Sequence, residues 1–529
     1  MRRAVLAGVL LAALPAPAGA ATRYVSPAGG AEGSCSRSAP CAAAHVLAGA
    51  GSAEGDTVIV LPGRYDEQPL VVARPLEILG RPDAPRPVFR LSVAGGVALT
   101  ITPEAQDTTV SHLDLGSSGE DGLGVEVQAA ATLSDLRVTS EGAPCLRSGA
   151  TGVRIADSAF TLTGVATVPC LETTGGDTDW TGVRVTALNG DVAAVFAGSG
   201  TIADATVSGR LTGLVVSGTP AVHRVTAAGS ERGLVLDEGT ALVTDSVLIA
   251  RQGGHAVLGR EGRHALINVT AWGAGKGSTG VRALNGAELT VTNTIARGHE
   301  ADLLAEPAST TIGPDCTAFA GCPAGRIRVT RSNFRTAPGV EDLGTNQSGS
   351  PRFVDAAFED FRLRPGSPAV DAGSFELNAS SADREGRFRW LGDSPDLGAY
   401  EYAPPRPLAP RSDRRAPVLR AVAMSTTRLR ASRRGVAFTA AAKAPAGALL
   451  RWFLSERADV VLTLRRPGRD RPVLGTIVQP ADLGWGAIRL SGELNAALLP
   501  PGRYVLRVMA RDVTQNLSRP RDFVITVVR

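Results

Sequence analysis

Aromatic residues and lysines are scarce in this chain. Phe, Trp and Tyr make up 4% of the 529 residues, and Lys276 and Lys443 are the only lysines. A core must therefore be filled mainly by aliphatic side chains. The 55 basic and 51 acidic groups leave a net charge of +4. This balance predicts a mixed, solvated surface and argues against nucleic acid as a partner.

Several catalytic signatures are also missing. The chain contains no HExxH, no phosphate-binding loop, no GxSxG and no paired CxxC pattern. These absences exclude the enzyme classes that such motifs mark. After the first 20 residues no apolar run is long enough to cross a bilayer, and the chain shows no apolar sorting tail. We therefore expect no membrane span.

An imperfect repeat of about 22 residues runs from Thr109 to Gly298. Each copy has an apolar residue, then a small or polar one, then Asp or Asn. A period of this length indicates stacked units, and short runs of Val, Thr, Ile and Leu cut by Gly and Asn indicate strands. The repeated position is assigned to Asp114, Asp135, Asp157, Asp179, Asp204, Arg224, Asp245, Asn268 and Asn293.

This repeat predicts an all-β fold, a parallel β-helix in which equivalent positions touch from coil to coil. The Asp or Asn should form a tight turn, and stacked copies should make a hydrogen-bonded ladder. Alternation along a strand places the residues two positions earlier in the bore. These are Leu133, Ile155, Ile202, Val222, Val243, Leu266 and Val291.

Export is predicted by the first 20 residues. Two arginines precede an apolar run that ends in Ala18-Gly19-Ala20, the pattern of a cleaved secretory signal. Six cysteines suit an oxidising compartment. They form three predicted pairs, Cys35–Cys41, Cys145–Cys170 and Cys316–Cys322. Cys145 and Cys170 both follow a proline at the same place in successive coils, so a bond across one rung is expected, with an unbonded thiol stack as the alternative.

Residues 21–105 are predicted to form an amino-terminal cap and the first coils, with a short helix over residues 42–50. The segment contains Tyr24-Val25-Ser26, a paired-cysteine loop, Gly55-Asp56-Thr57 and Pro62-Gly63-Arg64-Tyr65. It resembles the opening of secreted bacterial right-handed β-helix proteins, which include pectate-lyase-like enzymes. A cap is physically required, because the first coil would otherwise expose a sheet edge. Repeats then fill residues 106–350, interrupted by a loop inserted at residues 305–324.

Residues 351–402 depart from the repeat. Phe361–Gly373 (FRLRPGSPAVDAG), the Asp383–Arg387 segment and Pro395–Tyr402 (PDLGAYEY) resemble the carboxy-terminal signature of the choice-of-anchor Q family of secreted β-helix proteins. We interpret this segment as a cap that closes the rod. Asp371, Asp383 and Asp396 could gather around Ca²⁺; alternatively, they bond turn amides and pair with Arg387.

A second domain follows. Residues 403–416 are rich in Pro and Arg and predict a semi-rigid linker. Residues 417–529 contain short strands and the segments LSERADVVLTLRR and LPPGRYVLRVMARDVTQNLS. They resemble the immunoglobulin-like modules of secreted actinobacterial proteins, which implies a small β-sandwich.

The best coil-matched cluster of reactive side chains lies between residues 237 and 288. A lyase on such a rod needs carboxylates and a basic residue on one face, and a hydrolase needs paired carboxylates. The Asp-Asp and Gly-His-Gly phrases of polygalacturonases are absent. The alternative to an acid–base site is a solvated ladder of ion pairs. The candidates are Asp237, Glu238, Arg260, Glu261, His264 and Lys276, with Glu288 nearby.

We therefore expect a secreted or surface-associated monomer that presents an elongated face to polysaccharide or cell-surface components. Trp180 and Trp272 could stack on sugar rings, or could pack in the core. The alternatives are a polysaccharide lyase or glycoside hydrolase and a purely structural stalk. No cofactor is expected, and Ca²⁺ is the one alternative, as considered above.

Overall fold

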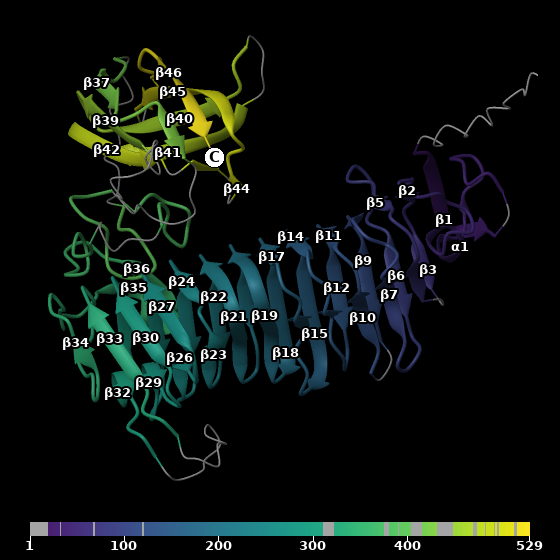
Figure 1. Cartoon of the computed structure of the whole chain (residues 1–529), viewed down its shortest axis with the longest axis horizontal. Helices are drawn as coiled ribbons and strands as arrows, with labels where there is room; N and C mark the ends of the chain where they lie inside the picture. Colours follow the sequence, from purple (N-terminus) through teal and green to yellow (C-terminus); the bar gives the residue numbers. More distant parts are fainter. Residues whose placement is uncertain are drawn as a thin grey trace, which may run out of the picture.

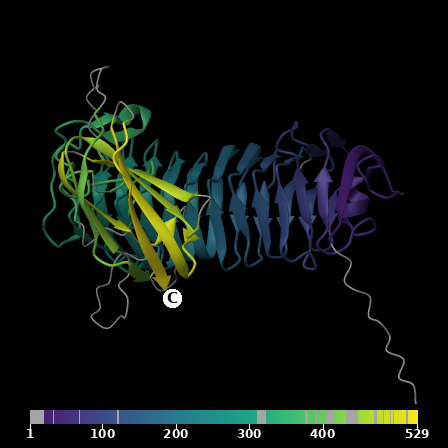
Figure 2. The ribbon, with the colours of Figure 1, turned by 90° about the horizontal axis from the view of Figure 1, so that it is seen from above.

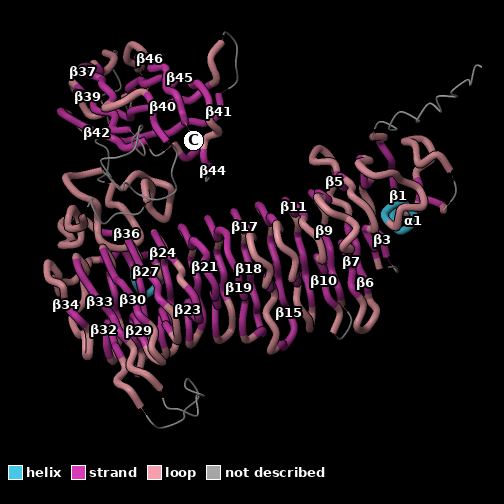
Figure 3. The backbone as a smooth tube through the Cα atoms, viewed as in Figure 1, coloured by secondary structure: helices cyan, strands magenta, loops and turns pink. Residues whose placement is uncertain are grey.

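The computed structural model describes residues 20–31, 33–66, 69–118, 121–309, 322–374, 380–389, 391–403, 415–430, 448–468, 473–481, 483–490, 492–494, 497–512 and 516–528. The predicted signal, apart from Ala20, and most of the linker lie outside these ranges. Strands stack into an elongated parallel β-helix, and a β-sandwich lies at the end of the rod that carries the last coils (Figures 1 and 2). Within these ranges, helix is confined to short segments (Figure 3).

Each coil contributes strands to three faces, which we name A1, A2 and B. Faces A1 and A2 form one 23-stranded sheet, because β19 (Val192–Ala203) and β21 (Thr212–His223) each run through both faces. The other A1 strands used below are β11 (Ala131–Ser134), β14 (Arg154–Ala156), β17 (Thr178–Thr181), β24 (Leu242–Thr244), β27 (Arg263–Ile267), β30 (Glu288–Thr292) and β33 (Arg326–Thr330).

Face A2 includes β10 (Leu123–Val127), β13 (Leu146–Ser148), β16 (Leu171–Thr173), β23 (Arg232–Gly239), β26 (His255–Gly259), β29 (Thr279–Ala283) and β32 (Ala301–Ala305). Face B is an 11-stranded sheet. Its later strands are β18 (Arg184–Gly190), β20 (Thr206–Ser208), β22 (Thr226–Gly229), β25 (Val247–Ala250), β28 (Thr270–Gly273) and β31 (Ile295–Arg297). The pairings within all three faces are parallel, as predicted.

The bore is filled by the aliphatic side chains that the repeat predicted. All seven named residues are at most 1% exposed, including Leu133, Ile202 and Val243. Leu133 pairs with Ile155, and Ile155 with Trp180. Equivalent positions therefore stack in register along the rod, and apolar burial stabilises every coil against its two neighbours.

The repeated Asp or Asn forms the corner between faces A1 and B. Asp135, Asp157, Asp204, Asp245, Asn268 and Asn293 all have φ between 47° and 57°, and Arg224 has φ 51°. Asn268 Nδ2 donates to Asp245 Oδ1 at 3.2 Å, which confirms one rung of the predicted ladder. Short polar side chains adopt this left-handed conformation at low cost.

Two members of the predicted ladder are misassigned. Asp114 begins β9 (Asp114–Ser117), and the left-handed corner of that coil is His112, with φ 57°. Asp179 lies within β17, where it pairs with Arg154, and the corner is Gly182, with φ 67°. Each Asp lies within three residues of the true corner, and spacing alone does not resolve such a slip.

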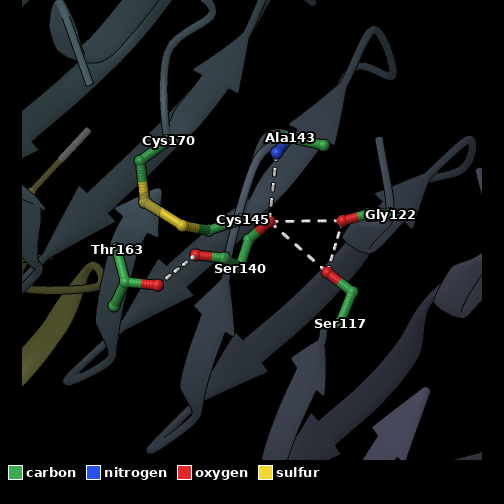
Figure 4. Close-up of a disulfide and its surroundings, with 7 residues drawn as sticks. All are labelled: Ser117, Gly122, Ser140, Ala143, Cys145, Thr163 and Cys170. Atoms are coloured by element: carbon green, nitrogen blue, oxygen red, sulfur yellow. Dashed lines mark hydrogen bonds between the residues drawn. A yellow bond between two sulfur atoms is a disulfide. The ribbon is translucent and has the colours of Figure 1, made fainter. Parts of the chain in front are cut away.

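Two of the three predicted disulfides are present. Cys145 and Cys170 are bonded across adjacent coils with their Cα atoms 4.7 Å apart, and Cys35 bonds Cys41. Figure 4 shows the inter-coil bond beside a group of hydroxyls in which Ser117 and Ser140 both donate to Gly122 O. Cys316 lies outside the described residues, so its pairing with Cys322 stays a prediction.

A strand and a short helix lie at the amino-terminal end of the rod. Helix α1 (Ala43–Leu47) buries Ala43, Val46 and Leu47, and β1 (Thr22–Gly30) pairs with β2 (Thr57–Val60). At the other end, Phe334, Ala337 and Val340 pack against the bore. Residues 331–350 therefore cover the last coil.

The described residues of 351–402, which we call the side cover, lie along face B rather than across the end of the rod. Phe361 and Ala399 pack against Val247 and Ile249 of β25. Leu363 and Leu397 pack against Ile295 of β31. All four residues of β25 are buried because the bore covers one side and the side cover the other. The end-closing role expected for this segment belongs instead to residues 331–350.

The carboxy-terminal domain is a two-sheet β-sandwich. One sheet has the order β37-β39-β42, from β37 (Leu419–Met424), β39 (Ala448–Leu454) and β42 (Gly484–Leu490). The other has the order β38-β46-β45-β40-β41, from β38 (Arg428–Arg430), β46 (Arg521–Val528), β45 (Gly502–Arg511), β40 (Ala458–Arg465) and β41 (Val473–Ala481). Leu450, Trp452, Val460, Tyr504 and Ile525 share the core, and Phe388 of the side cover packs against it.

Candidate functional site

The corner between faces A2 and A1 holds most of the predicted reactive cluster. β23 and β26 pair with Leu236 opposite Gly259, which places the next residues, Asp237 and Arg260, side by side. Arg260 Nε and Nη2 donate to the two oxygens of Asp237 at 2.5 and 2.6 Å. Both groups are partly exposed. This bidentate pair corresponds to the ion-pair alternative raised from the sequence, and it occupies both Asp237 oxygens.

His264 is buried at this corner, with 4% of its surface exposed. Its Nδ1 accepts from the Ala241 amide at 3.0 Å, and its Nε2 lies 2.7 Å from Glu261 O. Burial lowers the pKa of His264, although hydrogen bonds and Asp237 oppose the shift. The neutral ring, protonated on Nε2, satisfies both contacts. His264 therefore joins two coils and has no ring nitrogen left for a substrate.

Lys276 lies at a different corner of the coil. It precedes β29 on face A2, whereas the Asp237–His264 corner follows the face A2 strands. A strand of five residues spans about 16 Å, so the lysine is separated from the cluster by the width of a face. Glu238 and Glu261 are exposed. Arg263 pairs with Glu288 at 3.1 Å, and Arg326 lies 3.6 Å from the same carboxylate.

A depression of about 380 Å³ opens on face A1 beside this corner. Ala241, Leu242 and Ala265 line it with small or apolar side chains, and Arg263 and Glu288 line it with opposite charges. The lining is completed by Thr240, His264 and Thr290. This is an open, shallow depression and not an enclosed pocket. Of the predicted cluster, only His264 and the neighbouring Glu288 reach it.

The depression exists because outward positions on three successive strands carry unequal side chains. Ala265 of β27 lies between Leu242 of β24 and Thr290 of β30. An alanine between larger neighbours leaves space above the sheet. The repeat contains the signal for this, since Ala265 is one residue before the bore residue Leu266. Ala241 and Ala265 were not predicted as site residues, because an uncharged alanine carries no reactive group that marks it in the sequence.

The predicted Ca²⁺ ligands are engaged with backbone amides. Asp383 accepts from the Glu385, Arg387 and Glu401 amides at 2.7–2.9 Å, and Asp396 accepts from the Asp371 and Tyr402 amides. Among the described residues, no group of three or more His, Cys, Asp or Glu side chains is arranged to hold a metal ion. The amide contacts fit the non-metal alternative. The Arg387 side chain, however, pairs with Glu385 at 2.6 Å.

The buried cation near these carboxylates is Arg389. Its Nε donates to Asp245 at 2.7 Å, and its Nη1 donates to Gly398 O at 2.8 Å and to Glu401 at 3.2 Å. Asp245, Asp383 and Arg389 are fully buried. Asn293 likewise exchanges hydrogen bonds with the backbone of Ser374. The last ladder residues therefore dock the side cover onto the rod.

The side cover should become less stable as the pH rises. Burial raises the pKa of Asp396 to about 7 from 3.8, despite its amide hydrogen bonds. Burial and the Asp396 charge raise the pKa of Glu401 well above its usual value. The folded state therefore holds protons that the unfolded chain releases, and stability falls between about pH 4 and pH 7. Urea unfolding across this range measures the slope, and Asp396→Asn should flatten it. An equal slope in the variant would contradict the assignment.

Neither of the tryptophans considered as sugar platforms is available. Trp180 is fully buried in the bore, where its ring meets Phe196 edge-on at 5.1 Å. Trp272 projects from face B beneath the side cover, between Phe353 and Phe361 at 5.8 and 5.4 Å. Both rings have the packing role that was the alternative.

Comparison with known proteins gives no family assignment. No family model matches the sequence, and no curated protein matches it. Pectate lyase Pel9A is 15% identical, with 72% of this chain and 96% of that chain covered and a TM-score of 0.44. Tailspike protein 2 of Escherichia coli O157:H7 bacteriophage CAB120 is 9% identical over 89% of this chain and 64% of its own, with a TM-score of 0.37. The Dettilon tailspike protein is 10% identical, with 92% of this chain and 81% of that chain covered and a TM-score of 0.35.

These identities and TM-scores are too low to support an argument about this chain. The parallel β-helix is established instead by the strand pairing within this structure. No helix in the described part of the chain is long and apolar enough to cross a membrane.

Proposed function

We propose that this is an exported protein that binds a polysaccharide chain along face A1, with the depression at Ala265 as its principal subsite. The observation that carries the proposal is the depression itself, an open site of about 380 Å³ on a long parallel face. Thr240 and Thr290 supply hydroxyls, and the Arg263–Glu288 pair supplies a donor and an acceptor of opposite charge. This lining suits the hydroxyl groups of a neutral sugar unit.

The length of face A1 supports a polymer as the ligand. Many outward positions on successive strands carry hydroxyl or small side chains, alongside charged ones such as Arg154 and Asp179, and strands stack about 4.8 Å apart. A linear chain lying across them can contact several coils at once. On the amino-terminal side of the depression, the outward residues of this kind that keep some exposure are Thr132, Ser134, Ala156, Thr181, Thr201 and Ala221.

Export is supported by the predicted signal and by two disulfides. Membership of the choice-of-anchor Q family is part of the proposal, and it is supported by the sequence of Phe361–Gly373 and Pro395–Tyr402. We also propose that the sandwich is immunoglobulin-like. Its strand order, the parallel β38–β46 pair and the Tyr504 hydroxyl donating to Pro500 O at 2.7 Å support this type.

Filling the depression should remove binding. Ala265→Trp places an indole over the site on an outward position, so the fold should be retained. We expect affinity for a neutral polysaccharide that the wild type binds to fall by about tenfold or more, as for loss of a central contact. Calorimetric titration against a panel of neutral polymers measures this.

Arg147→Trp is the control, because it also places an indole at an exposed outward position, but on face A2 and away from the proposed path of the polymer. It should change affinity by about twofold at most. Equal affinity of wild type and Ala265→Trp for every polymer bound would contradict the proposal that the depression is a binding site. If no polymer binds, the stalk alternative is favoured.

Cleavage of a polymer is the second candidate, because Glu288 and Arg263 line the depression. The same incubations, followed by ultraviolet absorbance for unsaturated products and by a reducing-end assay, distinguish cleavage from binding.

A further inference from the structure

The sandwich carries a second surface, on the outer side of the three-stranded sheet β37-β39-β42. Along β39, Leu450, Trp452 and Leu454 are buried, whereas Arg451 is exposed and Phe453 half-buried. On β42, Trp485 is exposed over 72% of its surface, and a side chain at Gly486 would meet the ring of Trp452. Alternation therefore places Arg451, Phe453 and Trp485 together on the outside of the sheet.

Strand register arranges this surface as two rows across the sheet. Arg420 pairs with Phe453, and Phe453 pairs with Trp485. The Phe453 and Trp485 rings lie 5.6 Å apart at 76°. Three neighbouring strands span about 10 Å, so the first row is a cation beside two adjoining aromatic rings.

In the second row, Arg451 lies between Ala423 and Ala487. Two alanines leave the guanidinium accessible from both sides. Arg420 and Arg451 are both exposed, and neither has an ion-pair partner within the described ranges, whereas many arginines of the rod are paired, such as Arg260 with Asp237. This surface therefore joins apolar rings to unneutralised positive charge.

We propose that this surface, the aromatic platform, binds a polysaccharide that carries carboxylates, a uronate polymer. Trp485 packs on the apolar side of a sugar ring, as its exposed face allows. Arg420 and Arg451 donate to carboxylates of the same or adjoining sugars, since a guanidinium fork matches a carboxylate. The platform is separate from the depression on face A1 and does not depend on it.

The charges of the surface favour a sugar polymer over nucleic acid. Nucleic-acid sites need a basic stripe that neutralises many phosphates, and this platform offers two described cations on a chain whose net charge is +4. An exposed Trp beside Phe453, with Arg420 and Arg451 next to Phe453 on the same face, instead matches repeating units with one apolar face and one negative charge each.

The test uses the full-length protein and polygalacturonate, with calorimetric titration as the measurement. The wild type should bind, and Trp485→Ala should weaken binding by about tenfold, the usual scale for a central Trp. Arg451→Glu should weaken it at least as much, because it places a like charge beside the carboxylates. Methyl-esterified polygalacturonate should bind more weakly than the free acid.

Matched controls come from the other sheet of the sandwich. Val524→Ala removes an exposed apolar side chain, and Arg521→Ala removes an exposed arginine. Both should bind like wild type. Unchanged melting temperatures for all four variants would show that the sandwich is intact.

Three results would overturn the proposal. These are no binding of polygalacturonate by the wild type, equal binding by Trp485→Ala and Arg451→Glu, or equal competition by polyglutamate, which has carboxylates but no sugar rings. Ala265→Trp should leave polygalacturonate binding intact, and Trp485→Ala should leave neutral-polymer binding intact. Failure of one site is therefore distinguishable from failure of the other.

Discussion

Arg389→Ala should destabilise the protein by about 3–5 kcal/mol, because it leaves the buried Asp245 carboxylate without its cation. Asp245 is fully buried and Glu401 nearly so, and both are within 3.2 Å of the guanidinium. We expect the loss of stability to be concentrated at the contact between side cover and rod, since Asp245 belongs to the rod and Glu401 to the side cover. Urea unfolding followed by fluorescence measures the free energy, and limited proteolysis between residues 351 and 402 locates the opening.

Arg387→Ala is the matched control for this prediction. Arg387 is two residues away and pairs with Glu385 at a partly exposed position, where ion pairs contribute at most about 1 kcal/mol. Similar losses in the two variants would show that the buried network does not dock the side cover.

Replacing both Cys145 and Cys170 with alanine should cost about 3.5 kcal/mol, from the chain entropy released when a loop of 25 residues opens in the unfolded state. Both residues are fully buried in the bore, so the alanines remain apolar and the coils can stay stacked. Denaturant unfolding under non-reducing conditions measures the difference from wild type.

The Cys35–Cys41 pair provides the comparison. Its residues are six apart, and the same relation gives about 2 kcal/mol for this shorter loop. Removing it should therefore cost less than removing the inter-coil bond. If removing Cys35–Cys41 lowered the free energy of unfolding by more than removing Cys145–Cys170, the cap would limit the stability of the rod. The entropy argument for Cys145–Cys170 would then fail.

The features that followed from the sequence are those set by local period. Leu133, Ile155 and Val243 are in the bore because side chains alternate along a strand. Asp135 and Asn268 are left-handed corners because Asx residues tolerate that conformation. The misplacement of Asp114 and Asp179 has the same origin, since coils here vary in length and the corner residue can be His or Gly.

The position of the side cover could not be predicted from the local sequence pattern. One signal was present, because Val247-Leu248-Ile249-Ala250 lacks the alternation of a strand with one solvated face. The sequence alone does not tell which distant segment covers such a strand. The structure shows that Phe361 and Ala399 of the side cover pack against this strand.

The reactive cluster likewise could be predicted only in part from the local sequence pattern. Coil matching correctly joined Asp237 to Arg260, whereas Lys276 lies at another corner of the coil. Residues close in sequence can be separated by the width of a face, and the Ala265 depression arises from the sizes of neighbours on three strands.

The sequence by itself determined the stacked β architecture, the direction of the bore residues and the inter-coil disulfide, because each depends on repetition at short range. Only the tertiary structure decided that residues 351–402 cover a side of the rod, that Arg389 sits among buried carboxylates and that Trp485 is left outside. These depend on contacts between segments far apart in the chain, for which a repeat period carries no information.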